Sequence, residues 1–209
     1  MTAASLIVAL HDHFARHRVP HAFGGALALN YYAEPRATID VDVNVFVPVE
    51  RAPAVVEKLS MIGLRPEQNQ AAWAPVAGVR LRGDHGEVAD LFFSIDEHYA
   101  QVAGRARRFP FGTPPRRLPF LSAEDLVVFK LSFNRDKDWV DIRQLFVAGT
   151  DLDLDYVEAQ LIALRGPSMY PRLARLRALA RGSVTSTTAP ALMAEDVRAE
   201  WLGDAHAQR

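Results

Sequence analysis

The first half of the chain mixes strand-like and helical spacing of its apolar residues. Ile39 to Val47 alternates strictly between apolar and polar side chains, which is the clearest strand pattern in the sequence. Two more strands are expected at 79–82 and 87–94, separated by a turn that contains two glycines. Helices are expected at 3–17, after Gly25 to about Tyr32, at 50–62 and at 96–103. This half is therefore predicted to be mixed α/β.

The second half shows helical patterns after an irregular start. Arg105 to Leu121 contains four prolines and no hydrophobic period, so we expect a connecting segment there. Helices are expected beyond it at 123–133, 136–147, 153–165 and 169–181, followed by a Ser- and Thr-rich linker at 183–190 and a short amphipathic segment at 191–202. The prediction is an α+β fold, with a small mixed β-sheet core and flanking helices at 1–104, a connection at 105–121 and a helical region at 122–209.

Composition narrows the class of protein. Of the 209 residues, 49% are hydrophobic and 23% are charged, as is typical of soluble globular proteins. No apolar run approaches the roughly 18 residues of a membrane span, and the N-terminus lacks the pattern of a signal peptide. Cysteine is absent, which excludes disulfides and thiolate metal sites. We expect a cytoplasmic protein with no membrane segment.

The net charge of −1 is unevenly distributed. Residues 1–99 hold 8 basic and 12 acidic side chains, a balance of −4, whereas residues 100–182 hold 14 and 9, a balance of +5. An acidic region suits metal binding, and a basic region suits an anionic partner. Chance variation is the alternative explanation.

Carboxylates mark one face of the strand at 39–47. Side chains alternate across a strand, so Ile39 and the valines at every second position share an apolar face that we expect to be buried. Asp40, Asp42 and Asn44 share the other face. Two such carboxylates repel one another unless a cation lies between them, and hard oxygen ligands suit Mg²⁺. The alternative is a solvent-facing strand that carries two unrelated acids.

Paired glycines precede the first aspartate of this strand by about 15 residues. Glycines such as Gly24 and Gly25 let the backbone approach a ligand closely, and a helix N-terminus offers free N–H groups to phosphate. Such pairs are usually only turns, but a glycine-led helix followed by an Asp-x-Asp strand predicts a phosphate-binding turn beside a metal pair. Arg36 and Thr38 lie just before the acids, and Arg36 could pair with them or with phosphate.

Charged residues also cluster in the helical half. Lys130 lies two turns into an apolar helix, where it either snorkels at the helix edge or points at an anion. In the next helix, Asp138 and Asp141 are three residues apart on one face, and Lys137 and Asp141 are four apart. Two like charges at this spacing need a counter-charge. The candidates are Lys130, Arg135 and Lys137. A structural network and a substrate-binding one both fit this pattern.

Together these motifs resemble the nucleotidyltransferases of the DNA polymerase β superfamily. The motifs are Gly24-Gly25, Arg36-x-Thr38-x-Asp40-x-Asp42, and Lys130 with Arg135-Asp136-Lys137-Asp138-x-x-Asp141. Within the superfamily the chain is most similar, over about residues 20–146, to the AbiEii/MenT-type toxins of bacterial toxin–antitoxin systems. The resemblance implies that Asp40 and Asp42 bind Mg²⁺ and that Asp90 is the third metal-binding carboxylate, although the toxins do not always use this acid.

The resemblance also implies a reaction. A hydroxyl would attack the α-phosphorus of a nucleoside triphosphate and release pyrophosphate, with two Mg²⁺ ions at the carboxylates. The nucleotide would be held by Gly24, Gly25, Arg36, Thr38 and the lysines Lys130 and Lys137. One lysine and one aspartate of the helical half complete the active site in the toxins. The choice between the two lysines, and between Asp138 and Asp141, stays open.

The acceptor implied by the resemblance is the 3′ end of tRNA, often extended with pyrimidines, and the implied partner is an antitoxin. The basic residues of the connecting segment would bind the RNA because arginine neutralises phosphate, and the phenylalanines among them could stack on bases. They are Arg107, Arg108, Arg116 and Arg117, with Phe109, Phe111 and Phe120. A solvated loop with inward-packed phenylalanines is the alternative. Rival functions are modification of a protein or an antibiotic, a catalytically silent nucleotide-binding partner, and a nucleic-acid-binding module.

Overall fold

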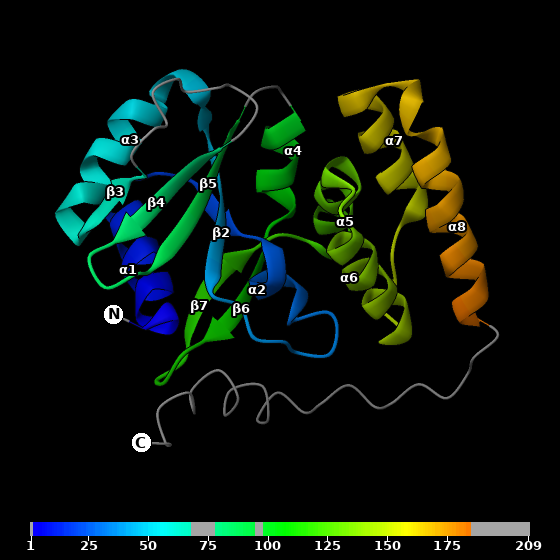
Figure 1. Cartoon of the computed structure of the whole chain (residues 1–209), viewed down its shortest axis with the longest axis horizontal. Helices are drawn as coiled ribbons and strands as arrows, with labels where there is room; N and C mark the ends of the chain where they lie inside the picture. The colour runs from blue at the N-terminus through cyan, green and yellow to red at the C-terminus, as the bar shows by residue number, and fades with distance from the viewer. Residues whose placement is uncertain (1, 68–77, 95–97, 185–209) are drawn as a thin grey trace. The chain divides into compact units, whose positions relative to one another are not determined.

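A computed structural model describes residues 2–67, 78–94 and 98–184 (Figure 1). Within these residues the chain forms two compact units. The first takes the chain up to Leu27 and from Ala37 to Leu121, and the second takes Ala28–Arg36 and the chain from Ser122 to Val184. The linker and amphipathic stretch predicted at 183–190 and 191–202 fall outside the described residues from position 185 onward.

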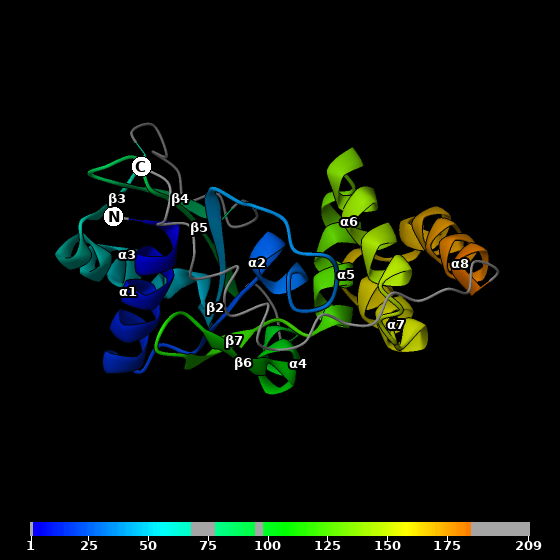
Figure 2. The ribbon, with the colours of Figure 1, turned by 90° about the horizontal axis from the view of Figure 1, so that it is seen from below.

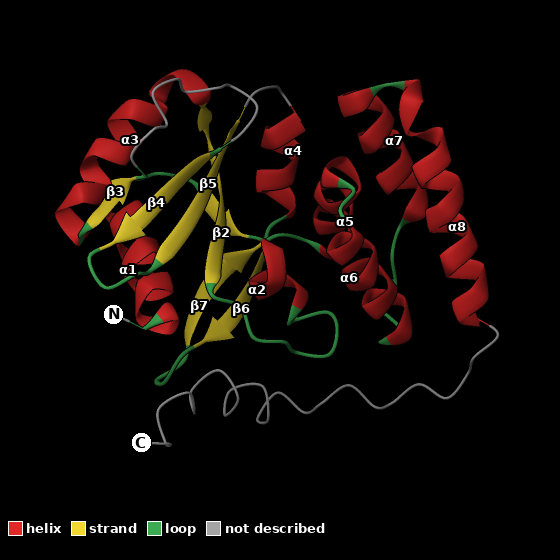
Figure 3. Cartoon of the chain, viewed as in Figure 1, coloured by secondary structure: helices red, strands yellow, loops and turns green. Residues whose placement is uncertain are grey.

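Seven strands of the described residues form one mixed sheet in the first unit, in the order β3-β4-β5-β2-β1-β7-β6 (Figure 3). They are β1 His21–Phe23, β2 Asp40–Pro48, β3 Leu64–Pro66, β4 Val79–Gly83, β5 Val88–Ser94, β6 Arg107–Phe111 and β7 Arg116–Phe120. The pairs β2–β5 and β1–β7 are parallel, and the other neighbouring pairs are antiparallel. The predicted α+β class is confirmed.

Helices cover the sheet of the first unit. They are α1 Ala3–Arg16, α3 Ala52–Leu59 with the 3-10 turns η1 Val49–Arg51 and η2 Ser60–Ile62, and α4 His98–Arg105. α1 and α3 lie side by side against the sheet in both views (Figures 1 and 2). The strand positions Val41, Val43 and Val45 are fully buried, as their alternation predicts. Ile39 is an exception, because β2 begins only at Asp40 and leaves this side chain 81% exposed.

The segment 105–121, expected to be an irregular connection, forms a β-hairpin instead. Strands β6 and β7 pair antiparallel at the end of the sheet, with Pro110 opposite Arg117 and Pro119 opposite Arg108. Proline lacks the backbone N–H that a ladder needs, and it is tolerated chiefly near sheet edges. The prolines are compatible with this hairpin because β6 is the edge strand and β7, which carries Pro119, pairs with β1 at Phe120 and not at the proline.

The second unit is helical. Its helices are α5 Ala123–Phe133, α6 Asp136–Val147, α7 Leu154–Arg165 and α8 Tyr170–Val184, with the 3-10 turn η3 Pro167–Met169 before α8. α5 packs against α6 and α7, and α8 packs against the same two helices. The short helix α2, Gly25–Leu29, begins in the first unit and ends in the second. Of the helices in the described ranges, none is both long and apolar enough to span a membrane.

Candidate active site

Three carboxylates lie on one face of the sheet in the first unit. Asp40 and Asp42 are two positions apart on β2, and parallel pairing sets Asp42 directly beside Asp90 of β5. Residues in register on neighbouring strands share a face, so the three predicted acids come together on one surface. The Asp40 side chain is 46% exposed and that of Asp90 is 18% exposed. Oxygen donors in this setting are the type that Mg²⁺ prefers.

The third carboxylate of this face is engaged by an arginine. Arg80 of β4 donates from Nε and Nη2 to the two oxygens of Asp90, at 2.8 and 2.7 Å, and these hydrogen bonds raise the pKa of Arg80 above its ordinary value. Its Nη2 also lies 3.9 Å from Asp40 Oδ2. Among the described residues, no group of three or more histidines and carboxylates is placed to hold a metal ion. Metal binding by Asp40 and Asp42 therefore stays a prediction, whereas Asp90 is held in an ion pair with Arg80.

The paired glycines pack directly on this carboxylate face. Gly25 has φ +55°, and a Cβ added there would lie 1.7 Å from Asp42 Oδ2. Gly24 donates its N–H to the Asp42 carbonyl at 2.9 Å, and a Cβ on it would come within 2.8 Å of Asn44 Nδ2. The glycines are thus required for the backbone to reach the acids. Because α2 has only five residues, its N-terminal dipole is small, and phosphate binding by Gly24 and Gly25 stays a prediction.

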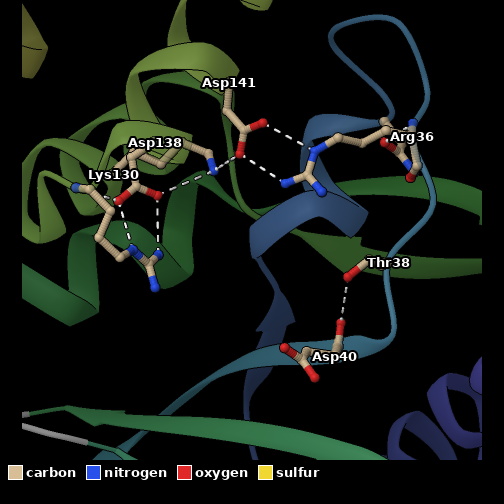
Figure 4. Close-up of polar contacts among 8 residues, drawn as sticks. Arg36, Thr38, Asp40, Lys130, Asp138 and Asp141 are labelled. Atoms are coloured by element: carbon tan, nitrogen blue, oxygen red, sulfur yellow. Dashed lines mark hydrogen bonds and ion pairs between the residues drawn. The ribbon is translucent and has the colours of Figure 1, made fainter.

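Arg36 and Thr38 each make a contact within their own unit (Figure 4). The Thr38 hydroxyl donates to the Asp40 carbonyl at 3.1 Å, which fixes the chain as it enters β2. Arg36, considered above as a partner for Asp40 and Asp42, instead donates from Nε and Nη2 to the carboxylate of Asp141. The contacts of both residues with nucleotide stay predictions.

Lys130 lies at the centre of a charge network in the second unit (Figure 4). Its Nζ is 2.6 Å from Asp141 Oδ2 and 3.9 Å from Asp138 Oδ1, and the side chain is only 8% exposed. Arg135 donates its backbone N–H and its guanidinium to Asp138, which caps the start of α6. The two buried aspartates therefore receive their counter-charges from Lys130, Arg135 and Arg36. Lys137 is exposed on the first turn of α6.

Electrostatics keep Asp141 ionised in this network. Burial alone raises the pKa of Asp141, but the hydrogen bonds and positive charges of Arg36 and Lys130 outweigh burial and leave the pKa below its ordinary value. A buried carboxylate with two cationic donors is charged at neutral pH. The contacts of Asp138 and Asp141 with Lys130, Arg135 and Arg36 therefore support a structural role for the two aspartates. Their catalytic role stays a prediction.

The four arginines of the hairpin are exposed, as RNA binding requires. Arg108 and Arg117 each donate to the other's backbone carbonyl, at 3.0 and 2.8 Å, and Arg116 pairs with Asp12 of α1. Arg107 is exposed beside them.

The phenylalanines of the hairpin pack inward. Phe111 and Phe120 are buried at 3% and 0% exposure, and the rings of Phe109 and Phe111 contact that of Phe120. The expectation that these phenylalanines stack on RNA bases is therefore wrong for Phe111 and Phe120. The strand register places Phe111 and Phe120 on the face that packs inward and Arg108 and Arg117 together on the opposite face, which therefore carries basic side chains without those two rings.

Arg80 is the site residue that the sequence patterns did not reveal. A signal was present, because the turn at Gly83–Gly86 closes a hairpin in which Arg82 pairs with Val88 and Arg80 with Asp90. Counting outward from the turn places Arg80 beside the third carboxylate. The signal is easily missed, because the alternating arginines of β4 look like an ordinary solvent-facing edge.

Comparison with known proteins shows which solved structures share this fold. No protein-family model matches the sequence, and no curated protein matches it either. Among solved structures, the chain is similar to the antibiotic-resistance factor ANT(2'')-Ia, with 19% identity and a TM-score of 0.55 over 84% of this chain and 96% of that one. It is also similar to the lincosamide antibiotic adenylyltransferase LnuA, with 15% identity and a TM-score of 0.51 over 69% and 96%. The chain therefore has a fold found in nucleotidyltransferases.

Proposed function

We propose that this protein is a nucleotidyltransferase, which transfers a nucleoside monophosphate from a triphosphate to an acceptor hydroxyl and releases pyrophosphate. The observation that carries the proposal is the carboxylate face, with Asp40 and Asp42 on β2 and Asp90 in register on the parallel strand β5. This face lies in a fold shared with an antibiotic-resistance factor and a lincosamide antibiotic adenylyltransferase. A fold alone does not define a reaction, so the residues of the face are the stronger support.

The residues of the face have separate roles in this proposal. Asp40 and Asp42 hold Mg²⁺, which when bound supplies Lewis-acid activation of the phosphoryl group and the acceptor hydroxyl. Gly25 lets the backbone pack against the Asp42 carboxylate, at a position where a side chain would collide with that carboxylate. Of the two lysines, Lys137 is exposed and able to meet a triphosphate, whereas Lys130 is committed to Asp141 and Asp138. Lys130 therefore acts as a positioning residue.

For the acceptor, we favour the 3′ end of tRNA, and for the biological role a toxin of the AbiEii/MenT type that is controlled by an antitoxin. The sequence motifs support the toxin assignment, and the exposed arginines of the β6–β7 hairpin support an RNA acceptor. Such an enzyme would act in the cytoplasm, where tRNA is found. Expression in a bacterial host should then arrest growth, and Asp40→Ala should relieve the arrest.

A second candidate is modification of an antibiotic or another small molecule. It is favoured by the structural likeness to the antibiotic-resistance factor ANT(2'')-Ia and to LnuA, whose structure holds lincomycin. Both likenesses are below 20% identity, so they do not specify the acceptor. Here expression should raise the tolerated concentration of an antibiotic and leave growth unaffected.

One assay separates these functions. Purified protein is incubated with Mg²⁺ and each α-labelled nucleoside triphosphate, with total tRNA, an aminoglycoside or a lincosamide as acceptor. Label on tRNA supports the toxin, label on an antibiotic supports the second candidate, and no transfer to any acceptor favours a silent partner. Asp42→Ala should abolish all transfer, by at least about a thousandfold. Asp84→Ala, at an exposed acid in the β4–β5 turn, should leave it intact.

A further inference from the structure

Arg80 is placed so that one guanidinium contacts two of the three carboxylates. β4 and β5 pair with Arg80 opposite Asp90, so the two side chains lie on the same face of neighbouring strands. Two parallel hydrogen bonds, Nε to Oδ1 at 2.8 Å and Nη2 to Oδ2 at 2.7 Å, occupy both oxygens of Asp90. Nη2 reaches within 3.9 Å of Asp40 Oδ2. The negative face thus contains its own positive charge.

The Arg80–Asp90 pair opposes metal binding at Asp90. A bidentate arginine–carboxylate pair is among the strongest side-chain contacts in proteins. A divalent cation in contact with Asp90 would lie close to the guanidinium, and the two positive charges would repel each other. Asp40, by contrast, is 46% exposed and meets the same guanidinium only at 3.9 Å. The acids are therefore not equivalent toward a metal.

We propose that Arg80 is a built-in counter-cation that keeps Asp90 out of the metal's ligand set in the nucleotide-free protein. The inference rests on the proposed function, because it concerns the metal site of the same carboxylate face. Asp40 and Asp42 then hold the first metal ion without Asp90. Asp90 becomes available only when the guanidinium moves to another anion, and the triphosphate of the substrate is an anion of the right charge. Arg80 is a positioning residue that sets metal affinity and couples it to nucleotide binding.

The chain offers a matched control on the same strand. Arg82 follows Arg80 by two positions and therefore lies on the same face of β4. It pairs with Glu67, Nε to Oε1 at 2.7 Å, in an exposed ion pair. Arg82→Gln removes the same charge with the same substitution but leaves the Arg80–Asp90 pair in place. The Arg82→Gln variant therefore shows how much of any effect comes from removing one positive charge near the site, as opposed to losing the Arg80–Asp90 pair.

The test measures Mn²⁺ binding to the full chain in the absence of nucleotide. Binding is monitored through the electron paramagnetic resonance signal of the free Mn²⁺ ion. Arg80→Gln should tighten Mn²⁺ binding about tenfold, whereas Arg82→Gln should change it less than about twofold. Adding Asp90→Asn to Arg80→Gln should return the affinity to about the wild-type value, because the freed carboxylate is then removed. Arg80→Lys keeps the charge without the bidentate geometry and should fall between wild type and Arg80→Gln.

Two outcomes would overturn the proposal. One is Arg80→Gln binding Mn²⁺ no more tightly than Arg82→Gln, with circular dichroism showing all variants folded. The other is the double variant binding as tightly as Arg80→Gln, because the gain would then not involve Asp90.

If Arg80→Gln does not fold, the Mn²⁺ affinity of Arg80→Lys becomes the test. A wild-type Mn²⁺ affinity in Arg80→Lys would then contradict the proposal. If Asp42→Ala abolishes Mn²⁺ binding, the metal site of the proposed function survives either result. If neither wild type nor any variant binds Mn²⁺, both proposals fail.

Discussion

Arg36 donates two parallel hydrogen bonds to Asp141, from Nε to Oδ1 at 3.1 Å and from Nη2 to Oδ2 at 3.0 Å, across 105 residues of sequence. Lys130 binds the same carboxylate at 2.6 Å. One acidic side chain thus joins α5, α6 and the segment Ala28–Arg36, which explains why this segment belongs to the second unit. Thr38, two residues later, already belongs to the first unit.

Asp141→Asn should therefore be strongly destabilising. The free energy of unfolding should fall by about 3–5 kcal/mol at neutral pH, because the buried Lys130 loses its closest anionic partner and keeps only Asp138 at 3.9 Å. The pKa of Asp141 is lowered in the folded protein, so its stabilisation is present above the ordinary pKa near 4 and is lost as pH falls through the lower folded value. In urea titrations, the difference from wild type should be constant between about pH 5 and 8 and should shrink below about pH 4.

Asp151→Asn, at an exposed acid after α6, is the control and should match wild type throughout. A difference between Asp141→Asn and wild type that persists unchanged down to about pH 2 would mean that the carboxylate charge is not what stabilises the network.

The two candidate lysines should separate into a structural and a substrate-binding one. Lys130→Met leaves Asp141 without its closest cation in a buried site, so it should lower the free energy of unfolding by about 3 kcal/mol. Lys137→Met changes an exposed side chain and should alter stability by less than about 0.5 kcal/mol. The same change should raise KM for the triphosphate about tenfold if Lys137 binds phosphate as proposed, because it removes that positive charge. The opposite assignment would follow if Lys130→Met were stable but inactive and Lys137→Met kept the wild-type KM for the triphosphate. Lys130 would then be the substrate-binding lysine.

Gly25→Ala tests whether the backbone must touch Asp42. The new Cβ would lie 1.7 Å from Asp42 Oδ2, and the φ of +55° is strained for any side chain. The carboxylate must move aside, so nucleotide transfer should fall at least about a hundredfold. Gly104→Ala is the matched control, since its Cβ meets nothing within 4 Å and alanine is favoured inside a helix such as α4. Equal transfer rates in the two variants would show that Asp42 does not need its observed position.

Local periodicity explains what the sequence predicted well. The alternation of Val41, Val43 and Val45 both located β2 and assigned Asp40 and Asp42 to its other face, because the period of a strand is set by the backbone itself. The boundaries of α5 and α6, Ala123–Phe133 and Asp136–Val147, also agree with those expected from the helical pattern. Asp90 came to lie beside Asp42, as the superfamily resemblance implied, through parallel pairing of β2 with β5.

Long-range pairing explains what the sequence did not show. The Arg36–Asp141 contact spans 105 residues, and no local pattern specifies which aspartate an arginine will meet at that distance. The β6–β7 hairpin was hidden because its strands are only five residues long and each contains a proline, which is an unfavourable residue in central strands. The objection does not apply to the edge strand β6, nor to β7, which pairs with β1 at Phe120 and not at Pro119, but both facts are known only once the strand order is known.

The exposed arginines of the β6–β7 hairpin should bind the RNA acceptor. Arg107, Arg108 and Arg117 are exposed, and the carbonyl contacts of Arg108 and Arg117 leave their positive charge unneutralised by those contacts. Arg116 differs, because it is paired with Asp12. Changing the first three to alanine should weaken transfer to tRNA and leave KM for the triphosphate within about twofold, since the hairpin lies apart in sequence from the proposed nucleotide contacts.

The salt dependence supplies the sharper readout for this triple variant. Each phosphate that an arginine no longer neutralises on a single strand should reduce the slope of log affinity against log salt concentration by about 0.7, so three should reduce it by about 2. The control replaces Arg51, Arg165 and Arg181, three exposed arginines elsewhere, and removes the same net charge. If both triple variants change the slope equally, the effect is one of net charge and the hairpin is not the acceptor surface. If only the hairpin variant flattens the slope, its arginines contact the RNA backbone.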